Sequence, residues 1–145
     1  MPEAIAIVDA SLVIKSLLPN PETSLCQSAL ERLQDTQLVA PALWIYEITS
    51  ALTKAVHFGQ LTESEGREVL QQALTLGVQV VLPDGVQSNL AFDWTRQLQR
   101  ASAYDSFYLV TAEALNAELW TADHRLVRAL GELKPAWLHW VGELT

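Results

Sequence analysis

The chain has 145 residues and a formal net charge of −8, and 50% of its residues are hydrophobic. This length and composition predict a single domain, residues 1–145, with a substantial core, and they exclude a disordered chain. The acidic balance argues against a nucleic-acid binder that depends on overall positive charge. It is compatible with binding through a local basic rim, and with a site that collects carboxylates around a divalent cation.

Targeting and redox features are few. No apolar run reaches the roughly 20 residues that a transmembrane helix needs, and the start MPEAIAIVDAS lacks the basic segment and cleavage site of a signal peptide. We therefore expect a soluble, cytoplasmic protein without a membrane partner. The single cysteine, Cys26, excludes an internal disulfide and a cysteine-based metal site, and its apolar neighbours predict a buried side chain.

The first part of the chain alternates apolar, β-branched runs with helical patterns. AIAIV is typical of a strand buried on both faces of a parallel sheet. Pro19 stops one helix, Pro21 starts the next, and Pro41 opens a third that Gly59 ends. The expected elements are, in chain order, a strand at 4–8, helices at 11–18 and 21–35, a strand at 37–40 and a helix at 41–59.

The same alternation continues to the end of the chain. Thr62 and Glu65 form the T-x-x-E pattern of a capping box, Asp84 is a candidate helix cap, and Gly131 ends a short helix. The expected elements are a helix at 62–76, a strand at 78–82, helices at 84–100 and 102–116, a strand with its exit loop at 117–123, a helix at 124–130 and a last strand at 136–141.

This alternation of strands and helices predicts an α/β fold. We expect three layers, α/β/α, around a mainly parallel central sheet. Ligands of such sheets bind at the carboxyl ends of the strands. The residues that follow each strand are therefore the first candidates for a functional site.

Four carboxylates occupy such positions. Asp9 directly follows the first strand, and Asp123 follows the strand in AELWTAD. Asp105 lies near the start of the helix before that strand. Glu47 lies one to two turns into the helix after QLVA, at the border of its apolar stripe. We expect these four side chains, from four distant segments, to converge at one edge of the sheet.

Each carboxylate also has a purely structural interpretation. Asp9 and Asp123 can cap the helices that follow them, Asp105 can belong to an S-x-x-D cap that starts at Ser102, and Glu47 can be a surface residue. Converging carboxylates, however, repel one another and need a cation or protons. Oxygen ligands favour Mg²⁺ or Mn²⁺, and such an ion can polarise a phosphoryl oxygen and activate water.

The pattern resembles the PIN domain family, specifically the toxin ribonuclease of a VapBC-type toxin–antitoxin pair. The resemblance covers nearly the whole chain, on the segments IVDASLVIKSLL, APALWIYEITSAL and SAYDSFYLVTAEALNAELWTADHRL. It implies an endoribonuclease that depends on Mg²⁺ or Mn²⁺, a homodimer and a cognate antitoxin. The acidic residues of the family map to Asp9, Glu47, Asp105 and Asp123, with supporting hydroxyls from Ser11 and Thr121. Ser50 departs from the pattern, since many relatives carry Asn there.

Two other interpretations stay open. The first is a PIN-like module that binds RNA or a protein without cutting. The second is a phosphate-accepting receiver, which needs an acidic pair near the first strand and a lysine after a late strand. The chain has only Asp9 there besides Glu3, and the late strand is followed by Asp123.

Basic and aromatic residues add candidate contacts for RNA. His124 follows Asp123 directly, so it is a candidate substrate contact. We expect the five tryptophans to serve packing rather than base stacking. The basic residues are either phosphate contacts or ordinary surface charges. These are Lys15, Lys54, Arg125 and Arg128.

Overall fold

The structure, a computed structural model, describes residues 4–144, so Glu3 lies outside the described residues. The strands are β1 (Ile5–Val8), β2 (Gln37–Pro41), β3 (Gln79–Val81), β4 (Glu118–Thr121) and β5 (Leu138–Trp140). The helices are α1 (Ala10–Leu17), α2 (Thr23–Arg32), α3 (Leu43–His57), α4 (Glu63–Leu74), α5 (Gly85–Gln97), α6 (Tyr104–Leu115) and α7 (His124–Leu130), followed by the short 3₁₀ turns η1 (Gly131–Leu133) and η2 (Val141–Leu144).

The five strands form one sheet in the order β3-β2-β1-β4-β5, and every neighbouring pair is parallel. The chain moves outward from β1 to β2 and β3, and it then crosses to the other side of β1 for β4 and β5. The direction of winding therefore changes between β1 and β4. In open parallel sheets this switch point, at the carboxyl ends of the strands, is where ligands bind.

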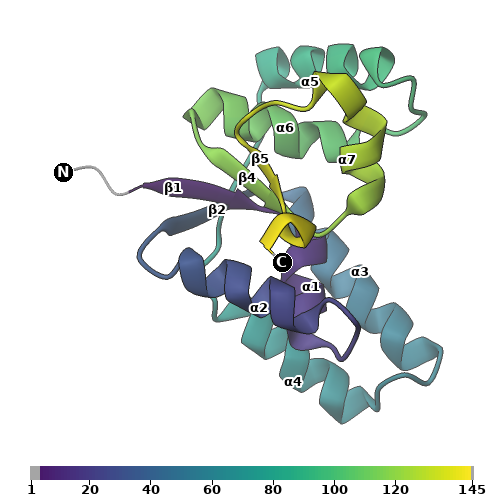
Figure 1. Ribbon diagram of the computed structural model, residues 1–145. Helices are drawn as coiled ribbons and strands as arrows, with labels where there is room; N and C mark the ends of the chain where they lie inside the picture. Colours follow the sequence, from purple (N-terminus) through teal and green to yellow (C-terminus); the bar gives the residue numbers. More distant parts are fainter. Residues whose placement is uncertain (1–3, 145) are drawn as a thin grey trace.

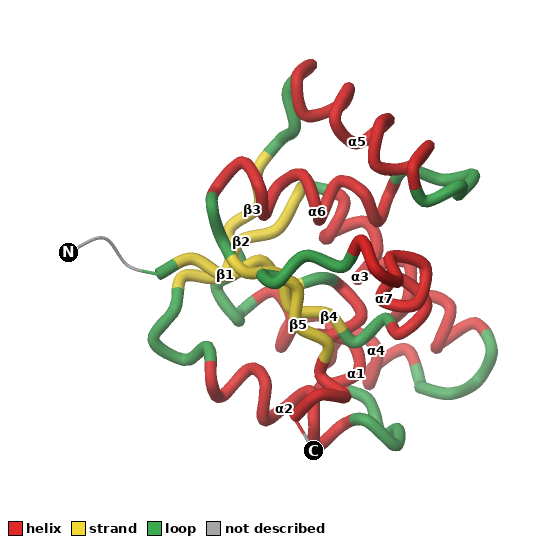
Figure 2. The backbone as a smooth tube through the Cα atoms, turned by 45° about the horizontal axis from the view of Figure 1, so that its top comes forward, coloured by secondary structure: helices red, strands yellow, loops and turns green. Residues whose placement is uncertain are grey.

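Helices cover both faces of the sheet, which confirms the expected three-layer α/β/α architecture. In Figure 1 helices α1 to α4 lie on one side of the strands, and α5 and α6 lie on the other. The rotated view of Figure 2 shows the same separation. Helix α6 packs against β1, β2 and β4, and α5 packs on α6, whereas α1 contacts α2, α3 and α4.

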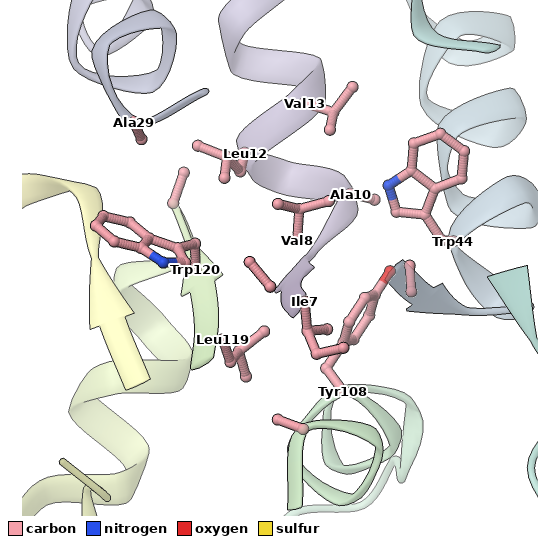
Figure 3. Packing of buried hydrophobic residues seen from close by; sticks show 14 of the residues in the cluster. Ile7, Val8, Ala10, Leu12, Val13, Ala29, Trp44, Tyr108, Leu119 and Trp120 are labelled. Atoms are coloured by element: carbon pink, nitrogen blue, oxygen red, sulfur yellow. The ribbon is translucent and has the colours of Figure 1, made fainter. Parts of the chain in front are cut away.

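The core centres on β1, whose side chains meet helices from both layers. Ile7 and Val8 have no exposed surface. Figure 3 shows these side chains between Leu12 of α1 and Tyr108 of α6, with Trp44 of α3 nearby. Burial on both faces explains why β1 is a continuous apolar run rather than an alternating one. Helix α6, which carries Asp105, packs on β1, whereas α3, which carries Glu47, packs on β2 and α1.

Several expected helix starts are confirmed by their hydrogen bonds. The Glu65 backbone N–H donates to Thr62 Oγ1 at 3.1 Å, and the Thr62 N–H donates to Glu65 Oε1 at 2.9 Å. Asp84 caps α5 through the Gln87 N–H at 2.8 Å. These local patterns predict helix starts well because their bonds join residues three apart.

Several expected boundaries are wrong, and the helix expected at 84–100, for example, ends at Gln97. Helix α3 begins at Leu43, because Pro41 is still part of β2 and pairs with Val81 in the parallel ladder. Helix α2 spans only Thr23–Arg32 instead of 21–35. Helix α1 begins at Ala10, because Asp9 is already its cap.

The expected S-x-x-D cap from Ser102 to Asp105 is also wrong. Helix α6 begins at Tyr104, and its cap residue Ala103 makes no side-chain hydrogen bond. The carboxylate of Asp105 is therefore not explained by helix capping. It has to be accounted for by its surroundings in the site.

The remaining expectations concern burial and membranes. Cys26, Trp44 and Trp120 are buried, and Trp94, Trp137 and Trp140 pack partly buried against the core. This confirms the packing role of the tryptophans. Among residues 4–144, no helix combines the length and the apolarity needed to cross a membrane.

Candidate active site

Asp9 lies at the switch point, between the end of β1 and the start of α1. Its backbone N–H donates to Trp120 O of β4 at 3.2 Å. Oδ1 accepts from Ser11 Oγ at 2.7 Å and from the Leu12 N–H at 3.0 Å. Oδ2 accepts from the hydroxyl of Thr121. The side chain is therefore held by three neutral donors, two from the start of α1 and one from the end of β4.

The pKa of Asp9 reflects this enclosure. Only 6% of the residue is exposed, and desolvation raises its pKa from 3.8 to about 6. The hydrogen bonds from Thr121, Ser11 and Leu12 lower the pKa, and the charge of Asp123 raises it further. Neutral donors orient this carboxylate but do not cancel its charge, so a nearby cation would be strongly favourable.

Asp123 is joined to Asp9 through the hydroxyls of the strand ends. Its N–H donates to Thr121 Oγ1 at 2.9 Å, and the Ala122 N–H donates to Ser11 Oγ at 3.2 Å. Asp123 Oδ1 also caps α7, accepting from the Arg125 N–H at 3.0 Å. The capping role predicted as its structural interpretation is thus real, and the residue still faces the site. Ser11 and Thr121 lie where the sequence places them, beside Asp9.

Glu47 reaches the same edge from α3. Tyr108 Oη donates to Glu47 Oε1 at 2.7 Å, which links α3 to α6. Burial raises the pKa of Glu47, the Tyr108 hydrogen bond lowers it, and the charges of Asp9, Asp105 and Asp123 raise it again. Glu47 therefore lies in the field of the other three acids.

Sequence reasoning missed Tyr108. Burial and the charge of Glu47 raise its pKa well above the ordinary range, so it stays a neutral donor. One signal was present: Tyr108 follows Asp105 by three residues, which places both on the same side of a helix. Its contact with Glu47, 61 positions away, is not readable from spacing.

Asp105 lies in the first turn of α6 and contacts a different kind of partner. Its Oδ2 is 3.2 Å from Nη1 of Arg100. Burial raises the pKa of Asp105, the Arg100 charge lowers it, and the charge of Asp123 raises it. Arg100 is the second residue that the sequence analysis did not identify, and its position five residues before Asp105 was the only available signal.

The four predicted acids thus share one edge and influence one another, but they are not tightly packed. Within residues 4–144, no three His, Cys, Asp or Glu side chains are close enough together to enclose an ion as they stand. The donor set is nevertheless carboxylate and hydroxyl oxygen, which suits a hard divalent cation. Such ions keep several waters and are commonly held by one or two carboxylates directly, so these residues fit one.

The predicted basic contacts lie at different distances from the acids. Lys15 Nζ pairs with Glu22 at 3.2 Å and donates to Ala122 O at 3.3 Å, so it borders the site. Arg125 lies 3.6 Å from Asp123 but is 87% exposed. The other predicted contacts are peripheral. Lys54 and Ser50 line a hollow together with Glu47. Arg128 is exposed, and the ring of His124 stacks on that of Trp140.

Comparison with known sequences gives consistent matches. The family model described as the PIN domain matches residues 6–131. Ribonuclease VapC3 of Mycobacterium tuberculosis is 32% identical over 123 residues, which cover 85% of this chain and 85% of that protein. Ribonuclease VapC9 of the same organism is 32% identical over 120 residues, covering 83% of this chain and 87% of the relative.

Solved structures share the fold at low sequence identity. PAE2754 from Pyrobaculum aerophilum superposes with a TM-score of 0.66 at 18% identity, over 97% of this chain and 93% of that one. A toxin–antitoxin complex from Klebsiella pneumoniae gives a TM-score of 0.65 at 15% identity, over 94% of this chain and 97% of its own. VapBC-1 from nontypeable Haemophilus influenzae gives a TM-score of 0.62 at 18% identity, over 95% of this chain and 98% of that one.

Proposed function

Because the chain belongs to the PIN domain family, we propose that it is a metal-dependent endoribonuclease and the toxin of a type II toxin–antitoxin system. One observation carries the proposal: Asp9 is held by Ser11 and Thr121 at the switch point of a parallel sheet, and the charges of neighbouring site acids raise the pKa values of Asp9, Glu47 and Asp105. The relatives that are 32% identical over most of their length are named ribonucleases.

We assign Asp9, Glu47, Asp105 and Asp123 to the site of Mg²⁺ or Mn²⁺, where one or two of them would bind the ion directly and the others through its waters. When bound, the ion supplies Lewis-acid polarisation of the phosphodiester and a water of lowered pKa. Ser11 and Thr121 fix the orientation of the Asp9 carboxylate, and Tyr108 fixes that of Glu47. Removal of a hydrogen-bond partner that orients a metal ligand typically lowers metal affinity 10- to 100-fold.

The proposed partners are RNA, a cognate antitoxin protein and a second copy of the chain. Similar structures include toxin–antitoxin complexes, which supports the antitoxin. A hollow of about 460 Å³ lies beside Glu47 and is also lined by Tyr46 and Tyr104, two residues that are 70% and 67% exposed. Exposed aromatic side chains at the rim of the site are suited to contact with a protein partner.

The test is cleavage of a panel of cellular and synthetic RNAs by the purified protein with Mg²⁺ or Mn²⁺. We expect cleavage that EDTA and Asp105→Asn abolish, while Asp93→Asn, an exposed acid on α5, leaves it intact. If folded wild-type protein binds RNA or an antitoxin but cuts nothing with either ion, the chain is instead a non-cutting PIN-like binding module.

A further inference from the structure

Arg100 has an unusual position for a cation. Its Nη1 is 3.2 Å from Asp105 Oδ2, yet this nitrogen is buried and meets no acceptor in hydrogen-bond geometry among residues 4–144. The side chain as a whole is 31% exposed. A buried charged donor without an aligned acceptor requires an explanation, since leaving one unsatisfied costs stability.

The backbone holds Arg100 in this position. Helix α5 ends with the Gln99 N–H bonded to Arg96 O at 3.1 Å and the Arg100 N–H bonded to Thr95 O at 3.1 Å, the Schellman pattern. Gln99 has a φ of 55°, a left-handed conformation in which glycine is usual and a side chain is disfavoured. Thr95 Oγ1 is in turn 2.8 Å from Ser106 Oγ, next to Asp105. The turn is therefore fixed to α6, and Arg100 is not a loosely placed surface residue.

Charge distribution distinguishes Arg100 from the other basic residues near the site. Arg125 lies 3.6 Å from Asp123, two residues earlier in the chain, but its side chain is 87% exposed. Lys15 is bonded to Glu22, outside the four acids. Within the described part of the chain, Arg100 is the cation that contacts a site acid while remaining largely enclosed.

We propose that Arg100 binds an RNA phosphate, and that Asp105 and the phosphate compete for it. In the metal-free protein Arg100 neutralises Asp105. A divalent ion at Asp105 displaces the guanidinium, whose planar fork of donors suits a phosphate oxygen pair. Metal and RNA then favour each other's binding. The ion at Asp105 frees Arg100 for the phosphate, and the phosphate draws Arg100 away from Asp105 and so frees this carboxylate for the ion. This inference rests on the proposed function and names the residue that receives the substrate.

The first test is titration calorimetry of Mn²⁺ into the RNA-free protein. We expect Arg100→Gln to bind Mn²⁺ roughly five- to tenfold more tightly than wild type, because a positive charge beside the site has been removed. Arg96→Gln, an exposed arginine on the same helix, should match wild type. Equal or weaker Mn²⁺ binding by a folded Arg100→Gln protein would overturn the competition.

The second test uses a fluorescein-labelled ten-nucleotide oligouridine in EDTA, so that cleavage plays no part. Asp105→Asn releases Arg100 from its ion pair. Adding Arg100→Gln in that background should therefore weaken oligonucleotide binding about tenfold. It should also reduce the slope of log K against log salt by about 0.7. In the wild-type background the same change should cost less than twofold. Equal losses in both backgrounds would show a merely general charge effect and overturn the proposal.

Folding and the proposed function are controlled separately. If Arg100→Gln does not fold, Arg100→Lys replaces it, since lysine keeps the positive charge and lacks the planar fork of donors. The loss of oligonucleotide affinity expected in the Asp105→Asn background is then two- to threefold. Wild type that binds neither Mn²⁺ nor the oligonucleotide contradicts the proposed function itself. Wild type that binds both, with no difference caused by Arg100, contradicts only this inference.

Discussion

Asp9 and Asp105 carry the same functional group at the same edge of the sheet, but different contacts surround them. Asp9 is 6% exposed and accepts three hydrogen bonds from neutral donors. Asp105 has 29% of its side chain exposed and contacts a cation, Arg100. Neutral donors fix a carboxylate in one orientation and leave its charge uncompensated, whereas a cation compensates the charge and can be exchanged for another.

The difference suggests a division of roles. Asp9 is the fixed part of the site, because its partners come from α1 and β4 and are mostly buried. Asp105 is the exchangeable part, because its partner sits on the turn after α5. Four predictions test this comparison, from the largest expected effect to the smallest.

The largest effect concerns activity. Asp9→Asn keeps the shape of the side chain but removes the charge that would hold the ion, so we expect RNA cleavage to fall by about 10³-fold or more. Initial rates at saturating Mg²⁺ measure this. Asp35→Asn, at an exposed acid in the turn before β2, serves as the matched control. Cleavage within tenfold of wild type would contradict the central role of Asp9.

The second prediction concerns stability without metal. The folded pKa of Asp9, about 6, exceeds the unfolded value of 3.8, so the folded state binds this proton more tightly. The contribution of Asp9 is therefore fully present below pH 3.8 and is lost as the pH rises through 6. The free energy of unfolding of wild type in EDTA should fall by about 3 kcal/mol relative to Asp9→Asn between pH 3.5 and 7.5.

Urea unfolding at a series of pH values measures this difference. Because both proteins share every other titrating group, their difference reports the titration of Asp9 together with the effect of its charge on the pKa of Glu47. A difference that stays constant with pH would show that Asp9 is not destabilised by burial.

The third prediction concerns the neutral donors. Thr121 is fully buried, donates to Asp9 and accepts from the Asp123 N–H. Thr121→Val keeps the shape and leaves both groups without this partner, so we expect a loss of about 2 kcal/mol in the free energy of unfolding. Thr53→Val, at an exposed position on α3, should cost less than about 0.5 kcal/mol. Equal costs would show that the hydroxyl at the switch point has no special role.

The smallest expected effect concerns Glu47. Tyr108→Phe removes the hydroxyl that holds this carboxylate but keeps the packed ring, so Mn²⁺ affinity should fall by about tenfold with stability nearly unchanged. Calorimetric titration measures the affinity. Tyr46→Phe, next to Glu47 in sequence but 70% exposed, is the control. An unchanged affinity in Tyr108→Phe would remove Glu47 from the site.

Much of this arrangement could be predicted from local sequence. The capping boxes at Thr62 and Asp84 involve residues three apart, and the buried strand 4–8 has a distinctive composition. The rule for parallel strand ends then placed Asp9 and Asp123 together. The strand order was not predictable, because nothing local in β4 indicates that it returns to the side of β1 opposite β2.

Contacts that depend on tertiary placement escaped the sequence analysis. Tyr108 meets Glu47 across 61 positions, and Arg100 is positioned by a left-handed turn at Gln99 that no glycine signals. Pro41 predicted a helix start too early, because its pairing with Val81 prolongs β2. Each failure arose where a distant partner, rather than the local residue pattern, determined the structure.

The central claim is that Asp9 and Asp105 belong to one divalent-metal site. Anomalous diffraction from crystals grown with Mn²⁺ tests it most directly. We predict a manganese peak at the carboxyl edge of β1 and β4, within coordinating distance of both carboxylates, with Arg100 moved away from Asp105. Two results would contradict the account. One is a manganese peak that contacts only surface acids. The other is an ordered edge that holds no Mn²⁺ at millimolar concentration, with the Arg100–Asp105 pair intact.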